Sequence, residues 1–381
     1  MSNSILEIKK NDCYGCELCV SACPVKAISM NFEQGFLYPR IDKNKCISCG
    51  KCLKMCIAKK QSFLNDKLST VYYYGYSMKK NIISRSTSGG IAYELYNMFL
   101  DEYKGVVYGV HYNEKTWFPE YTRIEDKEEL NKIQGTKYAQ ASKKTIYKSL
   151  LEDLKSDRYV LFIGTPCEIS AVKNFIGNKK YNILLVQLVC MGVTSPLLFK
   201  KYIDEKSNND IKEIHERFKK KNWENSYFII KKNNNDYCRP FDLTEFSFIF
   251  KWVGRSTCYN CKYKGEQRVA DITIGDFWGA ENYVDSKNKM GMSIISTHTS
   301  KGECIAKKMK WKKLDNYDVN KFNKYINKSR EFSRERELII KNYNNNNISC
   351  DTLVKKYAQG KTKIRYYISH IINNNVWDIF H

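Results

Sequence analysis

Eight cysteines in the first sixty residues follow one spacing that occurs twice. Each set reads C-x2-C-x2-C-x3-C, and the second set lies 33 positions after the first. Three cysteines at two-residue intervals can wrap a tight loop around one face of an iron–sulfur cube, and the fourth reaches the neighbouring cube. The spacing therefore predicts two [4Fe–4S] clusters, which transfer single electrons. The predicted ligands are Cys13, Cys16, Cys19 and Cys56 for one cluster, and Cys46, Cys49, Cys52 and Cys23 for the other.

This spacing is typical of two-cluster bacterial ferredoxins, in which a proline follows the fourth cysteine. Pro24 follows Cys23 in the first set, whereas Ile57 takes the equivalent place after Cys56 in the second. The departure affects a local turn and removes no ligand. Zinc is the first alternative, but zinc sites usually use two separated C-x2-C pairs. Disulfides are the second, and they would require an oxidising compartment.

Strands that alternate with helices are expected after the cysteine-rich segment. Short apolar runs such as 159–163 and 182–189 are typical of strands covered on both faces of a sheet. Helices are expected at 91–100, 143–154 and from Pro166 to about Phe175. This alternation predicts an α/β (α+β) fold with a mixed sheet and some parallel pairing. The last segment, 350–381, reads as one or two basic helices.

Four of the seven remaining cysteines stand where metal ligands would stand. Cys167 follows a strand and opens a helix, with Thr165 as the expected N-cap and Pro166 at the first helical position. Cys190 ends the next strand, and Cys258 and Cys261 form a C-x2-C pair. These four could hold a third [4Fe–4S] cluster. Because single cysteines are often only small buried apolar residues, the spacing alone leaves that alternative open.

The composition narrows the classes of protein that the chain could belong to. The net charge of +23 suggests nucleic acid, but it counts the cysteines as neutral and no nucleic-acid-binding motif accompanies it. Each [4Fe–4S] cluster with four thiolates subtracts about two charges. Residues 301–381 still carry 18 Lys and Arg against 8 Asp and Glu, which suits an acidic protein or an anionic membrane surface. The chain has no run long enough for a membrane span and no apolar signal region near Met1, and its 15 cysteines suit a reducing cytoplasm.

Seven short segments in the first 280 residues also occur, in the same order, in a known family. They are Ser86–Gly90, Gly135–Tyr138, Gly164–Cys167, Cys190–Val193, Phe218–Trp223, Cys258–Cys261 and Ala270–Gly279. On these segments the chain resembles the beta-subunit family of coenzyme F420 hydrogenases and dehydrogenases, in the version with an N-terminal two-cluster ferredoxin module. The resemblance implies a [4Fe–4S] cluster on Cys167, Cys190, Cys258 and Cys261 beside an FAD. It also implies a hydride carrier such as coenzyme F420.

No G-x-G-x-x-G fingerprint follows a strand, so a Rossmann-type flavin or nicotinamide site is not expected. The resemblance implies an FAD site of the family's own kind. A glycine-rich loop before a helix can direct backbone N–H groups at a pyrophosphate, although it is equally often an ordinary helix start. The candidate contacts are Ser88, Gly89, Gly90, Thr136, Lys137, Tyr138, Gln140, Asp276 and Trp278. No general acid or base is identified.

The sequence therefore predicts a flavin-dependent iron–sulfur oxidoreductase with three [4Fe–4S] clusters and FAD. It would pass electrons between a hydride carrier and a one-electron partner. The alternative is a non-catalytic electron-relay subunit of a larger redox complex. The expected organisation is a two-cluster domain at 1–66, a region like the N-terminal part of the family's beta subunits at 67–155, a flavin and cluster domain at 156–340, and a basic helical tail at 341–381.

Overall fold

The structure is a computed structural model of the 381-residue chain. It describes residues 3–59, 68–144, 146–265, 268–285, 287–343, 348–358, 360, 363–364 and 366–367. No helix in these ranges is both long enough and apolar enough to cross a membrane.

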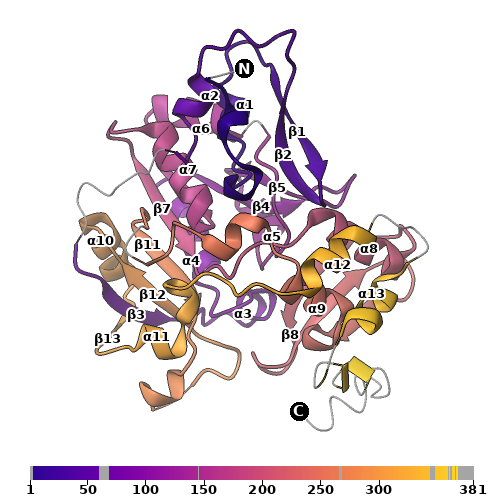
Figure 1. The fold of residues 1–381 in the computed structure, drawn as a ribbon. Coiled ribbons are helices and arrows are strands. Elements are labelled where there is room, and N and C mark those ends of the chain that lie inside the picture. Colours follow the sequence, from indigo (N-terminus) through magenta and orange to yellow (C-terminus); the bar gives the residue numbers. More distant parts are fainter. Residues whose placement is uncertain are drawn as a thin grey trace.

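A small N-terminal module contains the eight regularly spaced cysteines. Its antiparallel hairpin pairs β1 (Ile28–Glu33) with β2 (Phe36–Ile41), and its two short helices are α1 (Leu18–Ala22) and α2 (Lys51–Lys54). Figure 1 shows this module projecting from one end of the molecule, at the top of the view. Its own small core contains Ile5, Ile28 and Ile41 together with buried cysteines.

An eight-stranded mixed sheet forms the centre of the remaining chain, in the order β13-β3-β12-β11-β7-β6-β4-β5. The neighbours β4 with β6, β6 with β7, and β7 with β11 are parallel, and the remaining pairs are antiparallel. The strands are β3 (Val71–Gly75), β4 (Val106–Tyr112), β5 (Pro119–Ile124), β6 (Val160–Gly164), β7 (Ile183–Leu188), β11 (Ile272–Asp276), β12 (Ser293–Thr297) and β13 (Lys312–Leu314). The expected mixed α/β fold is confirmed, and strands from 67–155 and from 156–340 share this one sheet.

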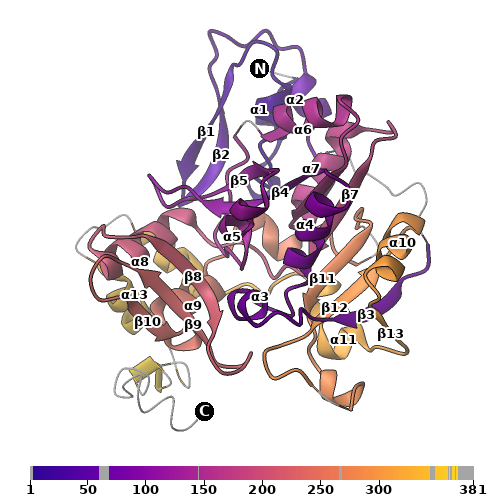
Figure 2. The same cartoon turned by 180° about the vertical axis from the view of Figure 1, so that it is seen from behind.

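Helices cover both faces of the central strands, which explains their continuous apolar runs. On one face α6 (Ile146–Lys155) and α7 (Pro166–Ile176) pack on alternate strand residues such as Val160 and Phe162. On the other face α4 (Ile91–Asp101) and α10 (Ser300–Lys308) pack on Leu161 and Ile163. Figure 2 shows α4 and α10 along the sheet from behind.

A second layer lies beside the large sheet. It contains a three-stranded antiparallel sheet of order β10-β9-β8 and the helices that pack on it. The elements are β8 (Glu213–Lys219), β9 (Ser226–Lys231), β10 (Tyr237–Pro240), α8 (Pro196–Ser207), α9 (Glu245–Trp252), α12 (Glu335–Asn342) and α13 (Cys350–Tyr357). The shorter helices elsewhere are α3 (Lys80–Arg85), α5 (Leu130–Ile133) and α11 (Val319–Phe322).

The predicted basic tail is only partly described. Its first part is not a separate appendage, because Cys350, Leu353 and Val354 of α13 are fully buried in the core of the second layer. Most of the segment from 359 onward lies outside the described residues.

Candidate functional site

The eight N-terminal cysteines form two neighbouring groups. Cys16 interacts electrostatically with Cys13 and Cys56, and Cys19 interacts with all three of them. We call Cys13, Cys16, Cys19 and Cys56 the proximal group. Burial raises the pKa of the Cys16, Cys19 and Cys56 thiols, and the neighbouring sulfurs raise it further. Three of these four thiols are buried and Cys13 is half-buried, and four neighbouring thiolates repel one another unless a cation lies between them.

The other four cysteines line one small cavity of about 20 Å³ at the outer end of the module. We call Cys23, Cys46, Cys49 and Cys52 the distal group. The backbone N–H of Ala27 donates to Cys23 Sγ at 3.2 Å. The chain thus brings the fourth cysteine of each repeat to the first three of the other repeat.

A third set lies in the main body of the protein. Cys261 interacts electrostatically with Cys167, Cys190 and Cys258, and we call these four the body group. Burial raises the pKa of all four thiols. Among the described residues, no three His, Cys, Asp or Glu side chains converge closely enough for a single metal ion. A cubane core is larger than one ion, so its thiolates stand further apart than zinc ligands do.

Local structure places two cysteines of the body group, Cys167 and Cys190, just beyond the carboxyl ends of the parallel strands β6 and β7. Thr165 caps α7 together with Glu168, and Cys167 occupies the first turn with its Sγ 3.3 Å from Thr165 Oγ1. Cys190 follows β7, the strand adjacent to β6, and the N–H of Gly192 donates to Cys190 Sγ at 3.2 Å. Gly192 has φ +114°, and a Cβ there would lie 3.0 Å from Cys258 Cβ. Only glycine allows the chain to turn between these two cysteines.

A cavity of about 780 Å³ opens at the same edge of the sheet. The ends of β6, β7 and β11 line it, as expected for open α/β sheets, in which ligand crevices lie beyond the carboxyl ends of the strands. Cys190 of the body group also lines it. The predicted FAD contacts among its lining residues are Ser88, Gly90, Thr136, Lys137, Tyr138, Asp276 and Trp278.

Two predicted contacts are positioned differently. The N–H of Gly89 donates to Ser293 Oγ at 3.0 Å, so it is not directed at the cavity. A Cβ on Gly89 would lie 2.7 Å from Gly75 O and Ser293 N, so this glycine allows the loop to approach the sheet. Gln140 is buried away from the cavity, where its Oε1 accepts from the N–H of Leu37 at 3.1 Å. Its predicted role as an FAD contact does not fit this position.

Charged side chains from β8 face the cavity region, and sequence reasoning assigned them no role. Arg217 lines the cavity and interacts electrostatically with Asp276 at the end of β11. Lys219 is fully buried, and burial lowers the pKa of its ammonium group to about 7. Burial also raises the pKa of Asp276, which Arg217 and Lys219 partly offset. The sequence did offer one indication of this pair, because Arg217 and Lys219 are two positions apart on one strand and so lie on the same face.

Two further groups near the cavity have shifted pKa values. Burial lowers the pKa of Lys137 to about 7, and its Nζ donates to Gln134 O at 2.8 Å. Burial raises the pKa of Glu216 to about 8, although its carboxylate accepts hydrogen bonds from Tyr112 Oη and from the N–H of Tyr138. Lys137 lines the cavity, and so does Tyr138, whose N–H donates to Glu216.

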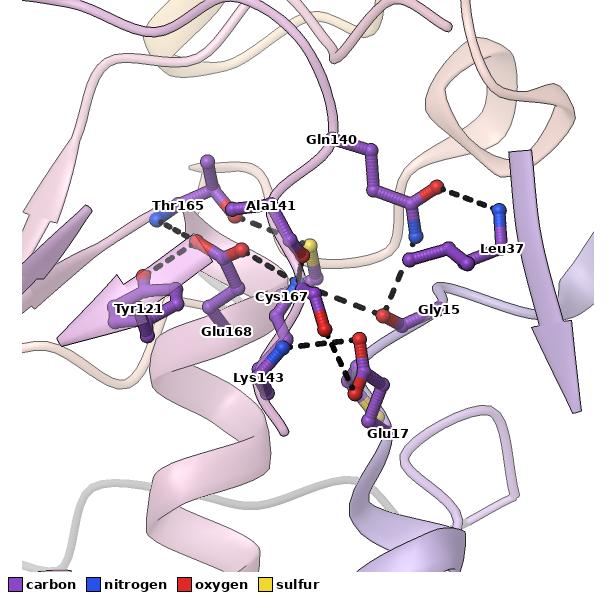
Figure 3. A network of polar contacts seen from close by, with 12 residues as sticks. Gly15, Glu17, Leu37, Tyr121, Gln140, Ala141, Lys143, Thr165, Cys167 and Glu168 are labelled. Carbon is purple, nitrogen blue, oxygen red and sulfur yellow. Dashed lines mark hydrogen bonds and ion pairs between the residues drawn. The ribbon is translucent and has the colours of Figure 1, made fainter. Parts of the chain in front are cut away.

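A buried polar network joins the N-terminal module to α7 (Figure 3). The ammonium group of Lys143 lies 2.8 Å from Glu168 Oε1, and it also donates to Ala141 O and Gly15 O. Glu168 Oε2 accepts from the N–H of Thr165 at 2.8 Å and from Tyr121 Oη at 2.7 Å. Lys143 interacts electrostatically with both Cys16 and Cys167, so it lies between the proximal group and the body group.

Arg255 forms a second connection between the same two groups. It is 1% exposed, and its guanidinium donates to Cys13 O at 2.7 Å, to Leu37 O at 2.9 Å and to Gln140 Oε1 at 3.0 Å. Arg255 Nη2 lies 3.5 Å from Cys13 Sγ, and its charge also acts on Cys258. A single guanidinium therefore bonds to the proximal loop and lies near the body group.

Two tyrosines fill the remaining space between these groups. The rings of Tyr14 and Tyr263 pack edge to face with centroids 5.2 Å apart. Both interact electrostatically with Cys167, and Tyr263 also interacts with Cys16 and Cys56. The order from the cavity outward is therefore body group, proximal group and distal group.

Comparison with known proteins identifies families that match three parts of the chain. The sequence matches "4Fe-4S dicluster domain" over residues 12–60, which confirms the predicted two-cluster module. It also matches both parts of the coenzyme F420 hydrogenase/dehydrogenase beta subunit, the N-terminal part over residues 72–145 and the C-terminal part over residues 157–325. A search of curated protein sequences finds no match. A chain from the F420-reducing [NiFe] hydrogenase complex of Methanosarcina barkeri is similar in structure, with 20% identity, coverage of 65% of this chain and 81% of that chain, and a TM-score of 0.44.

Proposed function

Since the chain belongs to the coenzyme F420 hydrogenase/dehydrogenase beta-subunit family, we propose that it is a flavin-dependent iron–sulfur oxidoreductase. It would exchange electrons between a hydride carrier at the cavity and a one-electron carrier at the distal group. The observation that carries this proposal is that Cys190 belongs to the body group and also lines the cavity. The proposed two-electron site in the cavity therefore lies directly beside the first cysteine group of the proposed one-electron path.

The side chains present fit three cubane clusters. Each group supplies four thiols, and backbone N–H groups donate to the sulfurs of Cys23 and Cys190. Such donors stabilise thiolates in a buried site and adjust the potential of a cluster. We assign one [4Fe–4S] cluster to the proximal group, one to the distal group and one to the body group.

The cavity fits a flavin dinucleotide in size and in lining. Its volume of about 780 Å³ lies within the range of cofactor pockets. We propose that Thr136, Lys137 and Tyr138 contact the flavin from one segment, Ser88 and Gly90 from another, and Asp276 and Trp278 from the end of β11. When bound, the flavin would supply hydride exchange and the clusters would supply single-electron transfer.

The residues around the cavity would bind and orient the cofactor and the carrier. Arg217 carries a permanent positive charge that suits a phosphate or an anionic ring edge. Lys137 and Lys219, with pKa values lowered to about 7, can each hold or release a proton near neutral pH. Trp223 and Trp278 pack edge to face with ring centroids 4.5 Å apart at the cavity wall, where they offer aromatic surface to a cofactor ring.

Anaerobic purification with iron, sulfide and flavin measured together tests the proposal. Three cubanes and one flavin predict about twelve irons and one FAD per chain. The variant Cys261→Ser should retain about eight irons, whereas Cys304→Ser, at an exposed cysteine outside the three groups, should retain about twelve. About eight irons in the unmodified protein would refute the third cluster.

The remaining candidate is the non-catalytic relay subunit, and the same preparation distinguishes it. A protein with bound FAD that a hydride donor bleaches is an enzyme, whereas clusters without flavin would leave only the relay. We propose that reduced coenzyme F420, or a hydride donor of similar chemistry, is the carrier. The fifteen free cysteines suit the reducing cytoplasm, which is the compartment we propose.

A further inference from the structure

The distal group contains Cys49, the only exposed cysteine among the twelve of the three groups. Cys49 is exposed, and Cys23 and Cys46 are half-buried. Two apolar side chains next to this group are also exposed, Ile47 by 62% and Val25 by 37%. Figures 1 and 2 both show this end of the module directed away from the main body.

The proximal group is less accessible than the distal group, with Cys13 half-buried and no exposed cysteine. Cys16, Cys19 and Cys56 are buried, and Tyr14 and Tyr263 cover them on the side of the body group. The distal group, which has the exposed cysteine, is therefore the better placed of the two for exchange with an external partner.

The surface around the distal group is strongly basic. Segments 23–26 and 42–54 contain Lys26, Lys43, Lys45, Lys51 and Lys54 but only one acidic residue, Asp42, and all six side chains are exposed. Among the ion pairs of the described chain, Lys45 with Asp42 at 3.5 Å is the only one that involves these lysines. Four of the five ammonium groups therefore have no carboxylate partner among the described residues.

We propose that this basic surface docks an acidic one-electron carrier protein. The proposal rests on the function proposed above, and it names the partner class at the distal end of the path. One electron would pass from the reduced carrier to this chain, or in the opposite direction, without transfer of a proton or an atom.

The arrangement favours a protein carrier over a lipid surface. Exposed apolar side chains, Ile47 and Val25, occur in the same two segments as the exposed lysines, and a mixture of apolar and charged side chains is typical of a protein interface. Complementary charge speeds encounter and fixes orientation, which a one-electron exchange at an exposed cysteine edge requires.

Binding measurements on the complete, cluster-loaded protein test the proposal. The probe is an acidic two-cluster bacterial ferredoxin, and Kd is measured by calorimetry at about 20 mM and about 200 mM salt. The variant Lys43→Glu/Lys51→Glu should raise Kd at least about tenfold at the lower salt and should reduce its salt dependence. The matched control Lys307→Glu/Lys310→Glu makes the same charge change on and just after α10, and it should alter Kd less than about twofold.

Three results would overturn the docking surface. They are an equal effect of the two double variants, no effect of either, and binding to vesicles rich in anionic lipid with no binding to the ferredoxin. Basic cytochrome c serves as the opposite probe, and it should bind the Lys43→Glu/Lys51→Glu variant at least as well as the unmodified protein. Iron content of each variant shows that the module has remained folded.

The outcome is separable from that of the proposed function. Ferredoxin binding depends on the module and not on flavin. A flavin-free protein that still binds ferredoxin through these lysines would refute the oxidoreductase proposal and support the docking surface. If instead the protein contains flavin that a hydride donor bleaches, and ferredoxin binding does not depend on the lysines, the oxidoreductase proposal is supported and the docking surface is refuted.

Discussion

The ion pair between Lys143 and Glu168 gives the sharpest test of the buried polar network where the N-terminal module meets the main body. Both side chains are almost fully buried, with 4% and 8% of their surface exposed, and Nζ lies 2.8 Å from Oε1. Lys143→Met would leave the Glu168 carboxylate buried without its cation. Removal of one partner of a buried pair costs about 3–5 kcal/mol of folding free energy.

The double variant Lys143→Met/Glu168→Gln distinguishes loss of the charge pair from loss of packing. A glutamine retains an oxygen for the N–H of Thr165 and for Tyr121 Oη, and no buried charge remains. The double variant should therefore recover about 1–3 kcal/mol relative to Lys143→Met. Lys148→Met is a matched control, because its Glu152 partner is 3.8 Å away and the two side chains are 79% and 64% exposed. Its effect should stay below about 0.5 kcal/mol.

Apparent melting temperature at one fixed heating rate, under anaerobic conditions, is the suitable measurement, because cluster loss makes unfolding irreversible. Lys143→Met should lower it by roughly 5–10 °C, and the double variant should lower it by less. The reasoning fails if Lys143→Met is no more harmful than Lys148→Met, or if the double variant melts below Lys143→Met.

Three other perturbations test separate parts of the structure. Arg255→Gln should make the reduction potential of one cluster more negative by about 100 mV in an EPR-monitored titration. The reason is that a unit charge 3.5 Å from Cys13 Sγ contributes at most about 5 kcal/mol, and about half of this remains once the electron spreads over a cluster. Arg255→Lys should shift the potential less, and an unchanged potential in Arg255→Gln would contradict the assignment. Gly192→Ala, at φ +114° and with Cys258 Cβ only 3.0 Å away, should lower iron content by about four atoms per chain. Gly177→Ala, at φ +65° with nothing within 4 Å, should not, and equal losses in both would exclude a specific effect at the body group. Because burial raises the pKa of Glu216 from 4.5 to about 8, its stabilising contribution is complete below pH 4.5 and is lost as the pH rises to about 8. As the pH rises through that window, the Glu216→Gln variant should therefore become more stable relative to the unmodified protein, by up to about 1.4 kcal/mol per pH unit. A relative gain in stability as the pH falls would refute this prediction.

Local patterns predicted the features that depend on neighbouring residues in the chain. The doubled cysteine spacing led directly to the two-cluster module, because its loops are short. The strand and helix around Cys167 follow from an apolar run and from the Thr165 cap, and both were expected. The continuous apolar strands at the centre of the sheet also implied helices on both faces.

Features that depend on distant segments could not be predicted in this way. Gln140 stands beside three residues that line the cavity, yet its amide turns toward Leu37, more than a hundred positions earlier. Gly89 was predicted as a phosphate contact, whereas it is required by the close approach of the loop to the sheet. The position of Lys143 and Arg255 between two cysteine groups depends on how the module packs on the sheet, which no local pattern encodes.

The connections made by Lys143 and Arg255 also bear on how such a chain could arise by fusion. A ferredoxin-like segment joined to the body by a linker alone would leave the Arg255 guanidinium without Cys13 O and Leu37 O, two of its three oxygen acceptors. Lys143 would keep its partners in the body and would lose only the acceptor Gly15 O. Gly15, whose Cβ would lie 2.2 Å from Gln140 Nε2 and 2.9 Å from Arg255, must remain a glycine for the two parts to meet. A module taken from another chain would therefore need the glycine on its first cluster loop, and the recipient would need both cations. We therefore expect the N-terminal module and the main body to be inherited, exchanged and lost together.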